Sequence, residues 1–474
     1  MRKMRNYLLS LLCVTIVLTS CGVDESLNID QKNPSEVPAG GLFTNALKNL
    51  GDQMNSCSVN ENVFRLYAQY WAQTTYPDES QYNQVTRNIG GNIWSTMYRD
   101  VLKDLKGAKE LVSNGEAPSQ AQLAIIKFME VYAYSVLVDT FGDVPFTEAL
   151  DPLNPSPVYD DAATIYSALA SHLDEAIADL SSGAGFDASQ DIAYGGNVAQ
   201  WRQAAVSLKL RMAMRLADSN PSASQAMAES AFSAGPIVAN ADNFGINYLA
   251  SAPNTNPLWV SLVQSGRKDF VAANTLVDAM NPNNDPRLPT FFQMYDGAYV
   301  GGTYGNANGA SSNSDLSELI KMPDFKGDLI TAAEVHFLLS EAAARGYSVG
   351  GTAEAYYNSA IGVSMDEWGV STSDAASYLA LPEVAYATAD GDWMQKIGSQ
   401  KWVAMFNNGN EGWTTWRLFD LGLNGPEVDG VTLDIPTRFL YPVSEATLNG
   451  SQYDSAASAI GGDSKTTKIF WDVN

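Results

Sequence analysis

The sequence predicts a mostly α-helical protein, in which tetratricopeptide-like helix pairs form one side of a single domain and an irregular, loop-rich face forms the other. Two observations lead to this prediction. Apolar residues recur at helical spacing in several long segments that begin at capping residues and end at Gly or Pro. Between these segments lie long stretches rich in Asn, Gly, Pro and Tyr that show no such period.

The N-terminus has the pattern of a secretory signal. Three basic residues precede an apolar run over residues 7–18, and small residues lead directly to Cys21. The run is shorter than the roughly 20 residues needed to span a bilayer. We therefore expect cleavage of a signal peptide, residues 1–20, and lipid attachment at Cys21, where two or more acyl chains would anchor the protein stably. The alternatives are an ordinary signal peptide and a short uncleaved anchor.

Composition narrows the function of the remaining chain. Residues 21–41 are polar and contain Pro, as in a lipid-anchored tether, and we expect residues 42–474 to form one domain. Removing residues 1–20 takes away three of the 28 basic side chains and none of the 53 acidic ones, which leaves a net charge of −28. Such a charge repels nucleic acid. Cys57 has no partner for a disulfide in the mature chain, and no cofactor is expected.

The helix candidates appear in pairs. The first candidates cover residues 42–51 and 62–73. Apolar spacing then predicts a helix over residues 94–112, and a capping box at Ser119-x-x-Gln122 begins an apolar helix that reaches Thr140. Because that helix is apolar nearly all round, it should be central and buried.

Two further pairs follow the same pattern. Segments 160–180 and 197–217 are amphipathic, and Thr331-x-x-Glu334 caps a helix to residue 346 that is followed by a helix over residues 352–368 with tetratricopeptide-like spacing. Segment 236–325 is irregular, with one helix candidate at residues 270–280. A last helix is expected over residues 393–407, after which Gly409, Gly412, Gly425 and Pro426 should break the chain, and turns and short extended pieces should follow from residue 429.

Two irregular segments are the predicted ligand site, residues 74–91 and 295–313. Long loops are uncommon in a compact domain unless they serve a function. These two carry aromatic rings beside side chains that can hydrogen-bond hydroxyl or peptide groups. The predicted ligand-binding residues are Tyr76, Asp78, Tyr82, Arg87, Asn88, Tyr299 and Tyr304. Exposed tyrosines suit both sugar rings and peptides, so the sequence leaves oligosaccharide and oligopeptide open.

Other conspicuous residues have a structural interpretation. Trp94, Trp201 and Trp368 lie at helical spacing with apolar residues and should be core. The pair Arg211 and Arg215 suggests a solvated or salt-bridged helix face. The two histidines, His172 and His336, lack the spacing of a metal site, so no metal ligand is predicted.

Two other functions share some of these features. A surface glycoside hydrolase needs only two carboxylates, but no carboxylate stands in a recognisable motif, and helix-pair proteins more often present binding surfaces. A helical protein-docking scaffold would leave the aromatic loops unexplained. We therefore predict a non-catalytic binding protein.

Several motifs together resemble the SusD/RagB-like outer-membrane lipoproteins of Bacteroidota, in particular the starch-binding, outer-membrane-associated branch. The matching pieces are Phe141-Gly-Asp-Val-Pro-Phe146, Tyr194-Gly-Gly-Asn197 with Trp201-Arg202, the segment Ser207 to Arg215, Glu334-Val-His-Phe-Leu-Leu-Ser-Glu-Ala342, Gln400-Lys-Trp-Val-Ala404, Glu411-Gly-Trp413, Trp416-Arg417, Ile435-Pro-Thr-Arg438, and Tyr441-Pro442 with Glu445. Their order and spacing carry the resemblance, which covers essentially the whole mature chain.

The resemblance implies a location and a partner. It implies a SusD-like fold with an irregular, ligand-binding face, on a lipoprotein at the outer membrane that faces the cell exterior. Asp24 and Glu25 resemble a short form of the acidic export signal of such lipoproteins. Members of the family capture oligosaccharides or oligopeptides and deliver them to a SusC-like TonB-dependent transporter, which is the partner that the resemblance implies here.

Overall fold

A computed structural model of the chain describes residues 37–115 and 117–473. Its contacts divide the chain between residues 38 and 39, and the fold described below is that of residues 39–474. The predicted signal peptide, Cys21 and most of the predicted tether lie outside the described residues. Helix α2 begins at Ala39, so the folded unit starts within the last three residues assigned to the tether.

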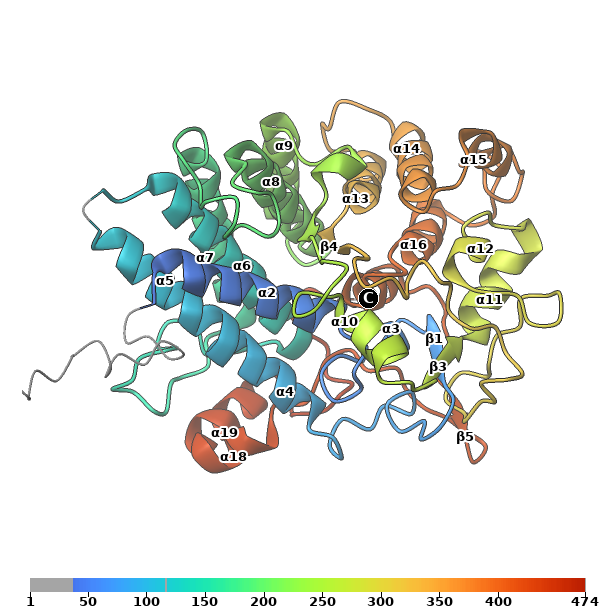
Figure 1. The fold of residues 1–474 in the computed structure, drawn as a ribbon, viewed down its shortest axis with the longest axis horizontal. Coiled ribbons are helices and arrows are strands. Elements are labelled where there is room, and N and C mark those ends of the chain that lie inside the picture. Colours follow the sequence, from blue (N-terminus) through green and yellow to red (C-terminus); the bar gives the residue numbers. More distant parts are fainter. Residues whose placement is uncertain (1–36, 116, 474) are drawn as a thin grey trace, which may run out of the picture. The chain divides into compact units, whose positions relative to one another are not determined.

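The helices of the three predicted pairs are present, and Figure 1 shows α6, α7, α8, α9, α13 and α14 lying beside one another across the molecule. Packing between α5 and α6, α7 and α8, and α13 and α14 matches the three predicted pairs. The longer helical elements are α2 Ala39–Asn55, α4 Ile89–Ser95, the π-helical η2 Thr96–Leu102, α5 Lys103–Ser113, α6 Gln120–Phe141, α7 Ala162–Asp179, α8 Val198–Arg215, α9 Pro221–Ala234, α13 Ala332–Ala344, α14 Ala353–Glu367, α15 Thr372–Leu379, α16 Trp393–Ala404 and α17 Gly409–Phe419.

Side-chain caps set where the main helices begin. Ser119 Oγ accepts from the Gln122 amide at 3.3 Å, and Thr331 Oγ1 accepts from the Glu334 amide at 3.2 Å. Each bond satisfies one of the amide donors that a helix start leaves free. Both predicted helix starts are therefore confirmed, although the Gln122 side chain donates to Gly185 O rather than back to Ser119.

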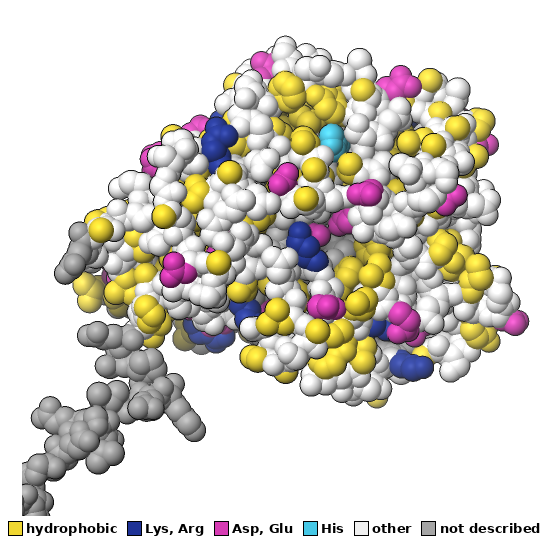
Figure 2. Space-filling model, turned by 45° about the horizontal axis from the view of Figure 1, so that its top comes forward, with side chains coloured by type: hydrophobic (Ala, Val, Ile, Leu, Met, Phe, Trp, Pro, Cys, Tyr) yellow, Lys and Arg dark blue, Asp and Glu magenta, His cyan; other side chains and the backbone are white. Residues whose placement is uncertain are grey.

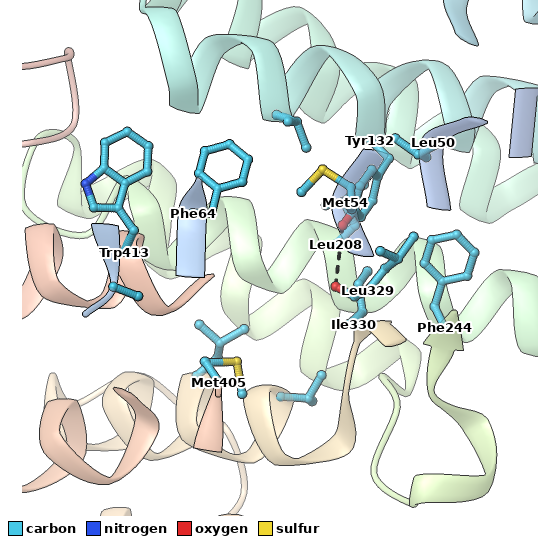
Figure 3. Close-up of a cluster of buried hydrophobic side chains, with 14 of the residues drawn as sticks. Leu50, Met54, Phe64, Tyr132, Leu208, Phe244, Leu329, Ile330, Met405 and Trp413 are labelled. Atoms are coloured by element: carbon cyan, nitrogen blue, oxygen red, sulfur yellow. Dashed lines mark hydrogen bonds between the residues drawn. The ribbon is translucent and has the colours of Figure 1, made fainter. Parts of the chain in front are cut away.

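Helix α6 runs through the core, as predicted. Among the described residues it is the one helix long and apolar enough to cross a bilayer, but most of it is buried by other elements, as in the core helix of a soluble fold. Figure 3 shows Tyr132 of α6 among side chains from α2, from α8 and from the two strands that carry Phe244 and Ile330. The Tyr132 hydroxyl donates to Leu329 O at 3.4 Å. Trp94, Trp201 and Trp368 are buried core residues, as predicted.

The shorter elements connect the pairs. They are α3 Phe64–Tyr67, β1 Trp71–Gln73, the 3-10 helix η3 Asn240–Asp242, β2 Phe244–Ile246, α10 Pro257–Trp259, the π-helical η4 Val260–Gln264, β3 Phe270–Ala272, α11 Asn274–Met280, the 3-10 helix η5 Asn281–Asn283, α12 Leu288–Phe291, β4 Gly327–Ile330, β5 Glu427–Val428, β6 Val431–Thr432, α18 Val443–Leu448 and α19 Gly450–Ala459. The strands form three antiparallel pairs, β1 with β3, β2 with β4, and β5 with β6.

Several boundaries differ from the prediction. The helix expected over residues 62–73 is only one turn, α3, followed by strand β1, because Trp71 pairs with Ala272 of β3. The candidate at residues 270–280 likewise divides into β3 and α11. At the C-terminus α18 and α19 are helices where turns were expected, and α9 and α15 carry no prediction at all.

The prediction that Gly409 and Gly412 break the chain is wrong, because both lie in helix α17. A Cβ at Gly412 would lie 2.1 Å from Tyr70 Oη, and one at Gly409 would lie 2.4 Å from the Arg65 amide nitrogen. These glycines permit close approach of α17 to α3 and the turn after it.

The two arginines of α8 lie in the interior and not on a solvated face. We call Asp139, Arg211, Arg215, Glu334 and Glu411 the charge cluster; all five are buried. Arg211 Nε lies 2.6 Å from Glu334, and Arg215 contacts Glu411 at 2.7 Å and Asp139 at 2.8 Å. Burial alone would raise the pKa of Glu411, but Arg211 and Arg215 outweigh it and hold that pKa at about 2. The salt-bridged alternative of the prediction is thus the one observed.

Candidate functional site

Strand pairing brings the two predicted ligand loops together. Strand β1 leads into residues 74–91 and pairs with β3, which contacts residues 295–313 through the Gly302 amide to Ala272 O at 2.8 Å. Two bonds then join the second loop to the end of β1 and to the first loop. The Asn308 amide donates to Gln73 O at 3.1 Å, and Gln81 Nε2 donates to Gly305 O at 2.9 Å. Segments more than 200 residues apart in sequence therefore form one surface.

The first loop is held by side chains that bond within it. Gln73 donates to Glu79 at 2.7 Å and accepts from the Ser80 amide at 2.9 Å. Glu79 is fully buried and forms an ion pair with Arg87. Arg87 was predicted to contact ligand; the structure pairs its Nε with Glu79, while about a third of its side chain stays exposed.

Two of the four predicted tyrosines are buried. Tyr82 packs edge-on against Tyr67 with centroids 5.3 Å apart, and Tyr304 donates its hydroxyl to Leu66 O at 2.6 Å. Burial raises the pKa of both hydroxyls. The expectation that these rings are exposed for stacking is wrong. Both rings lie beneath the loops and hold them against α3.

The remaining predicted residues are accessible. Tyr76 is 71% exposed, Asn88 is exposed, and Asp78 and Tyr299 are half-buried. Asn88 lines a cavity of about 320 Å³ with Tyr441 and Tyr453, and no capping bond to α4 occupies its side chain. Of the predicted residues, the structure thus leaves the exposed ring of Tyr76, the half-buried ring of Tyr299 and the polar side chains of Asp78 and Asn88 accessible to a ligand.

Backbone strain concentrates in this part of the chain. Gln69, Tyr76, Tyr82 and Asn88 all have positive φ, between 49° and 62°. Such angles are uncommon outside glycine and cluster at binding sites, where the surrounding structure maintains them. Gln73 Nε2 donates to Tyr76 O at 3.1 Å, and the Asn308 amide donates to Gln73 O, so hydrogen bonds support the backbone that carries Tyr76.

A second cavity beside the loops includes residues that sequence reasoning missed. It measures about 370 Å³ and is lined by Tyr304, Gln69, Thr275 and the segment 422–427. Gln69 Nε2 donates to Asn424 O at 2.8 Å, which connects this segment to α3. Gly425 and Pro426 were predicted to break the chain here, but nothing in the sequence indicated that this segment would lie beside Tyr304. We call residues 74–91, 295–313 and 422–427 the loop face.

The described residues contain no group of three or more His, Cys, Asp and Glu side chains that could hold a metal ion. His336 Nε2 lies 3.1 Å from Val238 O, and His172 lies near the Phe146 ring. Figure 2 shows acidic side chains scattered over one face and few basic ones, in keeping with the net charge of −25.

Comparison with known proteins defines the class. A family profile described as SusD-like, starch-binding and associating with the outer membrane matches residues 31–442. The chain therefore belongs to the SusD-like family, a family of non-catalytic binding proteins. No curated protein matches it.

Solved structures give more specific likenesses. A chitin-binding SusD homolog from Flavobacterium johnsoniae is 25% identical, with a TM-score of 0.79, and the match covers 92% of this chain and 99% of that one. A SusD homolog from Bacteroides uniformis is 26% identical, with a TM-score of 0.76, over 91% and 99% of the two chains. A Bacteroidetes SusD-like protein has a TM-score of 0.81 over 92% and 100% of the chains, and at 24% identity it supports the fold alone.

Proposed function

We propose that this protein is a lipoprotein of the outer membrane, anchored through Cys21 and facing the cell exterior, that captures oligosaccharides on its loop face. The observation that carries the proposal is the strained, internally bonded loop that leaves Tyr76 71% exposed. Membership of a starch-binding family and likeness to a chitin-binding relative favour a glycan over a peptide.

Tyr76 and Tyr299 are the stacking residues in this proposal. A sugar ring presents C–H groups to an aromatic face, and Asp78 and Asn88 offer acceptors and donors for its hydroxyls. Tyr82, Tyr304 and Arg87 act indirectly, because their contacts hold the loops in place.

The test is calorimetry on purified residues 22–474 with starch and chitin oligosaccharides and with a peptide mixture. If stacking on an exposed ring contributes roughly 0.5 to 1.5 kcal/mol to the binding free energy, Tyr76→Ala should bind the ligand about twofold to tenfold more weakly. Tyr347→Ala is a matched control, because this half-buried tyrosine lies at the end of α13, outside the loop face. Unchanged affinity in Tyr76→Ala and in the Tyr76→Ala, Tyr299→Ala double variant would contradict the proposed site.

The proposal also includes delivery to a SusC-like TonB-dependent transporter. A tagged full-length chain in its native membrane should copurify with a large outer-membrane barrel in mild detergent. The Cys21→Ala variant should be released from membranes, and mass spectrometry should find acylated Cys21 at the N-terminus of the wild type. An unmodified Cys21 on membrane-bound protein would contradict the anchor, and isolation of the chain alone would contradict the partnership.

A further inference from the structure

A cavity outside the loop face combines carboxyl groups with aromatic walls. It measures about 320 Å³ and lies where the C-terminal end of α14 meets η3 and the start of β4. Its lining residues are Asn240, Asn243, Phe325, Lys326, Asp328, Asp366, Glu367, Trp368 and Asn407. We call it the carboxylate cavity. Its volume falls in the range of small-molecule sites in proteins.

The carboxyl groups around this cavity differ in their partners. Asp328 Oδ1 lies 2.9 Å from Lys326 Nζ, and Asp366 accepts from Asn240 Nδ2 at 2.9 Å. Glu367 makes no hydrogen bond or ion pair with any described residue, although Lys326 lies near enough to influence it. With all groups ionised, three carboxylates face a single ammonium, so the lining carries an excess of two negative charges.

An orphaned acceptor accompanies Glu367. Asn240 Oδ1 is buried and has no donor, whereas the Nδ2 of the same amide bonds both Val363 O and Asp366. Buried polar atoms without partners are rare in folded proteins and require an explanation. That oxygen has almost no accessible surface, so a donor supplied by a ligand would bond to Glu367 instead.

Desolvation and the nearby Asp328 and Asp366 raise the pKa of Glu367 to about 8, while Lys326 opposes the shift. Glu367 is half-buried, and its carboxyl ionises less readily than that of an ordinary glutamate. A cation that enters would restore the charge that burial suppresses.

The arrangement suits an organic cation better than a metal ion. The carboxylates do not converge, since the described residues hold no cluster of three metal-ligating side chains. An ammonium group offers three donors that can reach separate acceptors. Phe325 and Trp368, with ring centroids 6.0 Å apart, supply aromatic surface that attracts cations.

We propose that the carboxylate cavity binds a small molecule with a primary ammonium group, with Glu367 as its principal acceptor. The site does not depend on the loop face, and it would be present whether or not the loops bind glycan.

The test compares two probes of equal size by calorimetry on purified residues 22–474 at low ionic strength. The probe 5-aminopentan-1-ol carries one ammonium, and pentane-1,5-diol has a hydroxyl in its place. We expect the amine to bind at least tenfold more tightly than the diol. Because Glu367 must lose its proton, the heat at pH 7 should depend on the ionisation enthalpy of the buffer. Equal binding of the two probes would overturn the proposal.

Variants locate the binding. Glu367→Gln removes the charge at constant size and should reduce amine affinity to that of the diol. Glu354→Gln makes the same change in the exposed first turn of α14 and should leave affinity unchanged. Lys326→Met removes the competing ammonium and should tighten binding, which keeps the test valid if Glu367→Gln folds poorly. Unchanged affinity in a folded Glu367→Gln variant would overturn the assignment, as would weaker binding in Lys326→Met.

Discussion

The helix pairs and the loop face bury polar groups of different kinds. In the helix pairs the charge cluster joins side chain to side chain, as in Arg215 between Asp139 and Glu411. On the loop face most of the hydrogen bonds that involve a side chain run from that side chain to a backbone carbonyl, as in Tyr304 to Leu66 O and Gln69 to Asn424 O. Helices satisfy their own backbone, so their side chains are free to pair, whereas irregular backbone requires side chains as partners.

The largest test of this comparison is Arg215→Met. Removing one partner of a buried ion pair leaves uncompensated charge and typically costs about 3 to 5 kcal/mol. Chemical denaturation should show a loss of that size. The control is Lys127→Met, which removes a surface ion pair with the exposed Glu175 and should change stability far less. If both variants lost the same free energy of unfolding, the buried ion pairs of the charge cluster would contribute no more to stability than a surface ion pair.

The second test uses two tyrosines of the same loop. Tyr82→Ala removes a buried ring and should destabilise the protein by about 3 kcal/mol. Tyr76→Ala removes an exposed one and should change stability by less than about 0.5 kcal/mol. Thermal unfolding followed by circular dichroism measures both. If Tyr76→Ala destabilised as much as Tyr82→Ala, the division between supporting and presented rings would be wrong.

Removing one hydroxyl isolates a bond to loop backbone. Tyr304→Phe leaves the ring in place but removes the donor to Leu66 O, and it should cost about 1 kcal/mol. Tyr166→Phe, which removes a hydroxyl bonded to Asp139 of the charge cluster, should cost more because that acceptor is charged. If the denaturant m-values of the two variants are equal, their denaturation midpoints show which variant loses more stability.

The last expected effect concerns pH. The pKa of Glu411 is held near 2, below its ordinary value of 4.5, so its contribution to stability is complete above pH 4.5 and is lost as pH falls toward 2. Glu367 behaves in the opposite way. Its pKa of about 8 lies above the ordinary value, so stability declines as pH rises from 4.5 through 8.

The corresponding measurement is the melting temperature of Glu367→Gln against the wild type. The two proteins should melt together near pH 4, and the variant should melt a few degrees higher near pH 8.5. A constant difference across this range would show that Glu367 titrates normally in the folded state.

Local patterns in the sequence predicted the helix pairs well. Ser119 and Thr331 cap the helices that they were predicted to begin, and α6 is buried because it is apolar all round. Helix α17 escaped prediction because its glycines, usually helix-breaking, are required by contact with Tyr70 and Arg65, which are distant in sequence. Helix propensity depends on local sequence and does not reflect contacts with distant residues.

The candidate site was predictable only in part. The composition of residues 74–91 and 295–313 indicated a pair of functional loops, and the structure joins them. It could not indicate that Tyr82 faces inward while Tyr76 faces outward, because that choice depends on the positive φ of both residues and on the strand pairing of β1 with β3.

That strand pairing also has a consequence for the order of folding. Gln73 meets Phe270 and Asn308, and Gln69 meets Asn424, across separations of about 200 to 355 residues. Contacts so remote form slowly, because the entropy of closing a long loop is lost before the contact is gained. Helix pairs of low sequence separation should therefore appear first in refolding. Recovery of ligand binding should lag behind recovery of the helical circular dichroism signal, and a chain released before residue 424 should have helices but no completed loop face.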